Sequence, residues 1–130
     1  MPDLTVQQAD ELANQALRLK VAVGEFRSRF FDTLTPEQRE GLRTLAVELG
    51  DEVDHLTAVA INLSLADLQE TLAQLRDITS GVKNAVAHLG DVRKVITVAT
   101  ALVGLGAAIA SAHPGAVLSA LNDTMTSIQE

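Results

Sequence analysis

The sequence predicts an all-α protein, an antiparallel bundle of four to five helices with a central apolar helix rich in Ala and Gly. Two observations predict it. Through most of the chain, apolar residues recur at alternating spacings of three and four, which is the period of an amphipathic helix. A continuous apolar segment, Val95–Ala112, contains no charged residue and must be removed from water. Such a segment needs amphipathic helices around it, a copy of itself, or a membrane.

Composition limits the fold and the function. A chain of 130 residues with 47% hydrophobic residues forms one domain with one core, so residues 1–130 are expected to be a single helical bundle domain. The formal net charge of −7 argues against a nucleic-acid partner, which requires a basic surface. The chain has no Cys, which excludes disulfides and thiolate chemistry. Its first ten residues lack the basic and apolar regions of a secretory signal, so we expect a cytoplasmic protein.

The first two helices are expected at about residues 5–31 and 36–63. The link between them is short, so they should fold back on each other as an antiparallel hairpin. Capping-box spacing occurs at Thr5 with Gln8, at Thr35 with Gln38, and before the third helix at Ser64 with Asp67. The apolar seams are Ala9, Leu12, Ala16, Leu19, Val23, Phe26 and Phe30 in the first helix, and Leu42, Leu45, Leu49, Val53, Leu56, Val59 and Leu63 in the second.

Three further helices are expected at about residues 65–89, 91–112 and 114–129. Gly81 and Gly90 both lie in the apolar repeat of the third helix, and either glycine could bend or end it. We place the end at Gly90, because a left-handed Gly90 would terminate one helix and Asp91 would cap the next. Pro114 suits the first turn of the last helix.

The apolar segment Val95–Ala112 has 18 residues, the lower edge of what crosses a bilayer. Its Ala and Gly content favours a core helix, enclosed on all sides by the other helices. Small residues recur in it at every fourth position. They form a stripe along which another helix is expected to come closest, made of Thr100, Gly104, Ala108 and Ala112.

Two alternatives to a core helix remain for this segment. It could be buried in a symmetric homo-oligomer. It could also enter a membrane, with Arg93 and Lys94 near anionic headgroups, which would make the protein membrane-associated. In the second case the hydropathy pattern resembles that of helical pore-forming toxins, which carry an apolar segment among long amphipathic helices. The resemblance extends over Val95–Ala112 only and implies no functional residues.

One group of residues has the spacing of a metal site. Glu52 and His55 form a Glu-x-x-His pair, and Glu48 lies one helical turn earlier, so the three share one face of a helix. A dinuclear site in a helical bundle needs a second such pair, and the chain has none, so a solvated acidic face is the favoured interpretation. No phosphate loop, serine elbow or His-Glu-x-x-His motif occurs. We therefore expect no enzyme activity and no cofactor.

These observations favour a non-enzymatic interaction or assembly protein that forms a homo-oligomer or pairs with a partner helix through its coiled-coil-like apolar seams. The second hypothesis is a membrane-active protein that inserts residues 95–112. The third is a metal-binding protein that uses Glu48, Glu52 and His55. The sequence identifies neither the partner nor the number of subunits.

Overall fold

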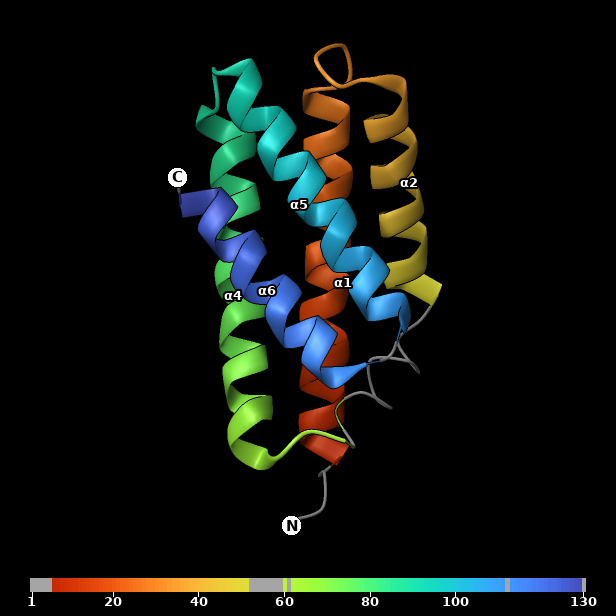
Figure 1. Cartoon of the computed structure of the whole chain (residues 1–130), viewed down its shortest axis with the longest axis vertical. Helices are drawn as coiled ribbons and strands as arrows, with labels where there is room; N and C mark the ends of the chain where they lie inside the picture. The colour runs from red at the N-terminus through yellow and green to blue at the C-terminus, as the bar shows by residue number, and fades with distance from the viewer. Residues whose placement is uncertain (1–5, 52–59, 61, 112, 130) are drawn as a thin grey trace.

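The computed structural model describes residues 6–51, 60, 62–111 and 113–129, which form five α-helices (Figure 1). The all-α bundle predicted from the apolar repeat is confirmed. The helices are α1 (Val6–Arg29), α2 (Pro36–Asp51), α4 (Leu65–His88), α5 (Val92–Ser111) and α6 (Pro114–Gln129). Residues 52–59, which belong to the second half of the predicted 36–63 helix, lie outside the described residues.

The five helices lie in two layers around one core (Figure 1). One layer contains α4, α1 and α2, with α1 in the middle, in contact with both neighbours. The other layer contains α5 and α6, which pack against each other, with α5 on α2 and α6 on α4. The helices α1 and α2 run antiparallel beside each other and form the predicted hairpin.

The helix starts follow the capping signals in the sequence. At α2 the backbone N–H of Thr35 donates to Gln38 Oε1 at 2.9 Å, and the N–H of Gln38 donates to Thr35 Oγ1 at 3.2 Å, a complete capping box. At α4 the N–H of Asp67 donates to Ser64 Oγ at 3.1 Å. The predicted cap at Thr5 lies outside the described residues.

The break between α4 and α5 lies where the sequence placed it, although Gly90 is not left-handed. The chain leaves α4 through Leu89, which is extended (φ −77°, ψ 120°) while its N–H still donates to Ala85 O. Asp91 caps α5 as expected, because its Oδ1 accepts from the N–H of Arg93 at 2.9 Å. The helix α4 runs without a break through Gly81.

Most described residues of the predicted apolar seams lie in the core of this single chain. Buried seam residues from α1, α2 and α4 face the buried side of α5 and α6. Seam side chains in the core are therefore unavailable to a partner, and association needs other surfaces. The buried seam residues include Leu12, Leu19, Val23 and Phe26 of α1, Leu42, Leu45 and Leu49 of α2, and Leu68, Leu72, Leu75 and Ile78 of α4.

The sequence pattern predicted that α5 would be enclosed on all sides by the other helices. That prediction is wrong, because α5 contributes only one face to the core. Only 39% of its most apolar stretch is buried. The packed neighbours α2 and α6 cover two flanks and leave the outward side to solvent. That side carries small residues such as Thr100 and Gly104 and no charged side chain.

Three glycines allow the helices to approach closely. A Cβ atom on Gly41 of α2 would lie 2.8 Å from Val103 Cγ2 of α5, and one on Gly106 of α5 would overlap the side chain of Leu45. A Cβ on Gly81 of α4 would likewise overlap Ile128 of α6. Each glycine thus receives a branched side chain from the opposite layer, which fixes the distance between the layers.

Two glycines of α5 provide a direct test of this packing. We expect Gly106→Ala to lower the free energy of unfolding by about 1–3 kcal/mol, because the added methyl group displaces the buried side chain of Leu45. We expect Gly104→Ala to raise it by about 0.5–1 kcal/mol, because its methyl group meets nothing within 4 Å and alanine favours the helix. Urea unfolding followed by circular dichroism measures both values, and equal effects at the two positions would contradict the assigned contact.

Candidate interaction surfaces

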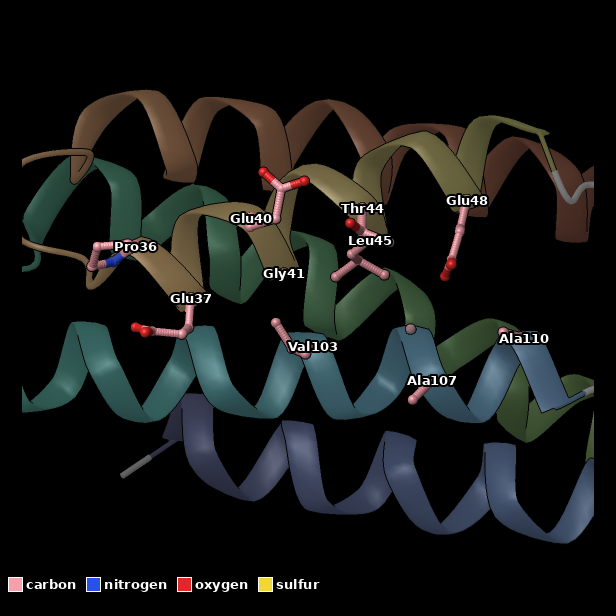
Figure 2. Close-up of a pocket in the computed structure, with 11 residues that line it drawn as sticks. Pro36, Glu37, Glu40, Gly41, Thr44, Leu45, Glu48, Val103, Ala107 and Ala110 are labelled. Atoms are coloured by element: carbon pink, nitrogen blue, oxygen red, sulfur yellow. The ribbon is translucent and has the colours of Figure 1, made fainter.

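A groove of about 620 Å³ runs along the surface where α2 and α5 meet (Figure 2). Its floor lies where the two helices approach closely, with Val103 packed on Gly41 and Leu45 packed on Gly106. The described residues that line it come from these two helices. They are Pro36, Glu37, Glu40, Gly41, Thr44, Leu45 and Glu48 of α2, and Val103, Gly106, Ala107 and Ala110 of α5.

The two walls of the groove differ in charge. Along α2, Glu37, Glu40, Thr44 and Glu48 follow one another at helical spacing and form an acidic rim. The α5 wall is uncharged and consists of valine, alanine and glycine. Figure 2 shows the carboxylates of Glu37 and Glu48 directed from α2 toward the side of α5, whereas Glu40 turns away from it.

One of the three carboxylates on the rim has a partner. Glu40 Oε1 accepts from Arg43 Nη1 at 3.0 Å, and both side chains are more than 60% exposed, so this pair adds little stability. Neither Glu37 nor Glu48 pairs with a cation among the residues that the structure describes. The rim therefore carries negative charge at both ends of the groove that nothing in the described chain neutralises.

A second surface is the outward side of the α5/α6 layer. From Val95 to Gln129 the sequence holds one charged residue, Asp123, whereas the rest of the chain is densely charged. We refer to the exposed residues of this side as the outer face. It consists of Thr97, Thr100, Gly104 and Ser111 of α5 and Ala116, Ser119, Asp123 and Thr126 of α6.

Most hydroxyl groups of the outer face already donate hydrogen bonds within their own helix. Thr97 donates to Arg93 O at 2.9 Å, and Thr100 donates to Ile96 O at 2.9 Å. Ser111 and Thr126 donate in the same way to backbone carbonyls of their own helices. Burial of this face would therefore leave these four donors satisfied, which lowers the cost of covering it.

The predicted contact stripe lies on this outer face and not inside the bundle. Thr100 and Gly104 are exposed, and Ala108 is half-buried. A Cβ on Gly104 would meet nothing within 4 Å among the described residues, so none of the five described helices packs there. Ala112 lies outside the described residues. Contact of the stripe with a helix of another chain stays a prediction.

Of the three residues in the metal hypothesis, Glu48 is described by the structure. It lies half-buried at the end of the acidic rim of the groove. Glu52 and His55 lie outside the described residues, so the structure does not test whether the three side chains converge. Within the part of the chain that is described, no three His, Asp or Glu side chains come together as a metal site would require.

Elemental analysis of the purified chain tests the metal hypothesis. We expect no stoichiometric iron, manganese or zinc, because a single Glu-x-x-His pair with one further carboxylate leaves a transition metal incompletely coordinated. About one metal ion per chain that is lost in Glu48→Gln and His55→Ala would contradict this expectation.

No family model, characterised protein or solved structure matches the chain. Its function is therefore inferred from its own residues. The sequence indicated Glu48 as a candidate metal ligand and Gly104 as a helix-contact residue, but it did not predict the groove. The repeat of Glu37, Glu40, Thr44 and Glu48 is visible in the sequence, but the sequence does not say that the uncharged α5 lies beside it.

Proposed function

We propose that this chain is a non-enzymatic assembly protein that forms a homodimer through the outer face of the α5/α6 layer. The observation that carries the proposal is an exposed helical surface with one charge, whose hydroxyl donors are largely bonded within their own helices. Such a surface loses little when it leaves water. The lack of any catalytic motif in the sequence supports a role without chemistry.

The distribution of charge favours a second copy on this face. Two chains with a net charge of −7 repel each other over most of their surfaces. The repulsion is smallest where both chains present the outer face, which holds only Asp123. A two-fold axis would place the same surface, with Asp123 as its one charged residue, on both sides of the interface, as in the commonest homodimers.

The outer face is large enough for a specific dimer. The 20 residues of α5 and 16 residues of α6 give lengths of about 30 and 24 Å at 1.5 Å per residue. Two packed helices present a width of about 20 Å, so the face covers roughly 540 Å² per chain. The total of about 1,100 Å² lies just above the roughly 1,000 Å² that a specific interface needs.

A charge introduced into the face tests the dimer. We expect the wild-type chain to have the mass of a dimer in size-exclusion chromatography with light scattering, and Gly104→Glu to have the mass of a monomer, because two buried carboxylates would face each other. The matched control is Gly24→Glu on α1, which is also an exposed helical glycine with nothing within 4 Å of a Cβ. It should remain a dimer, and a wild-type monomer at high concentration would disprove the proposal.

A second candidate function is reversible membrane association through the same face. The specific observation is that α5 is the one helix among the described residues long and apolar enough to cross a bilayer, while most of its apolar stretch is not buried. Arg93 lies exposed in its first turn, where it would meet anionic headgroups. A lipid surface and a second copy would compete for the outer face.

Liposome flotation separates the two candidates. If the outer face serves dimer formation, we expect the wild-type chain to stay unbound with vesicles of neutral and of anionic phospholipid, at neutral and at acidic pH. Flotation of the wild-type chain that is lost in Gly104→Glu and kept in Gly24→Glu would favour the membrane function instead. The mass measurement on the same samples shows whether lipid displaces the second copy.

A further inference from the structure

We propose that the groove between α2 and α5 binds a cationic amphipathic helix of a partner protein. The groove is distinct from the outer face, and its proposed role goes beyond self-association. It joins an apolar floor to an acidic rim on one side only, and a helix with an apolar stripe beside a row of Lys or Arg is complementary to both features.

The dimensions of the groove suit a helix. Its lining residues run from Pro36 to Glu48 along α2, a rise of about 18 Å, which equals roughly three helical turns. Gly106, Ala107 and Ala110 provide only small side chains on the α5 wall, so a third helix can pack closely against α5. Leu45 and Val103 supply the larger apolar surface of the floor. An incoming helix of about 12 residues would present apolar residues at positions i, i+4, i+7 and i+11.

The charges of the groove specify which helix it selects. Glu37 and Glu48 point toward the α5 side at the two ends of the groove and have no cationic partner among the described residues. The opposite wall has no charge between Val95 and Ser111. An incoming helix should therefore carry Lys or Arg along the edge that faces α2, while the edge that faces α5 should be apolar. This asymmetry also determines which side of the incoming helix faces α2 and which side faces α5.

A partner protein fits these charges better than a second copy does. The outer face, which the proposed function assigns to the second copy, offers no Lys or Arg to the rim. Among the described residues that line the groove, Thr44 alone has a side-chain hydrogen-bond donor, so this lining has no converging set of donors that would orient a small anionic or polar ligand. Its two recognisable features are carboxylates in a row and an apolar floor, both of which match helix recognition.

The test uses the full chain and a synthetic 14-residue helical peptide with Leu at positions i, i+4, i+7 and i+11 and Lys along one flank. Fluorescence anisotropy of the labelled peptide should show saturable binding to the chain. A peptide with Glu in place of each Lys, and a scrambled peptide of the same composition, should not bind. Binding of the scrambled peptide with equal affinity would overturn the proposal, because it would show attraction by net charge alone.

A variant that removes the charge of the rim tests whether the peptide binds in the groove. The double variant Glu37→Gln with Glu48→Gln should raise the Kd for the peptide by about five- to tenfold, as expected for the loss of two ion pairs at the protein surface. The control Glu25→Gln with Glu70→Gln removes the same charge from exposed positions on α1 and α4 and should leave Kd within about twofold. The difference between the two should disappear at high salt.

A steric variant tests the groove without changing its charge. Ala107→Leu places a larger side chain in the groove from an exposed position of α5, so it should raise the Kd for the peptide by at least about tenfold. The helix content measured by circular dichroism should stay unchanged. Ala73→Leu at an exposed position of α4 is the matched control.

Equal affinity in Ala107→Leu and Ala73→Leu, or no saturable binding of the Leu/Lys peptide by the wild-type chain, would overturn the proposal. The Gly104→Glu variant keeps the groove intact and should bind the peptide normally. Failure of the dimer proposal and failure of the groove proposal are therefore distinguishable.

Discussion

The fit of branched side chains onto glycines holds the two layers of the bundle together. Leu45 packs on Gly106 and Val103 on Gly41, so that α2 and α5 each receive a side chain from the other. Because α5 has no charged residue beyond its first turn, ion pairs contribute nothing to its position there, and shape alone decides it. The burial of one face of α5, the exposure of the other and the presence of a groove beside it all follow from this close approach.

The layers also divide the charge of the molecule. The charged residues of α1, α2 and α4 surround the core on one side, while the α5/α6 layer holds a single carboxylate from Val95 to Gln129. The groove lies along the boundary between these regions and takes its acidic rim from α2 and its neutral wall from α5. One chain thus presents two surfaces of different chemistry, and a partner that fits one of them is a poor fit for the other.

Local signals in the sequence predicted the helices well, because caps and apolar periods act over a few residues. Thr35 with Gln38 and the break at Asp91 are examples. The environment of α5 was predicted less well, because hydropathy says that Gly104 and Gly106 are both apolar but not which of them faces Leu45. The groove could not be predicted, since its rim and wall come from helices whose adjacency depends on the packing of the whole chain.

The order of the helices around the core has a consequence for how the chain assembles. The pairs α1/α2 and α5/α6 join sequence neighbours, whereas the contacts of α2 with α5 and of α4 with α1 and α6 close much longer loops. Loop closure costs more entropy as the loop grows, so the two hairpins should form first and dock afterwards. The glycine contacts between α2 and α5 are then made in the late step. Until that step is complete, the apolar side of α5 remains open to competing chains, which makes docking the stage at which aggregation competes with folding.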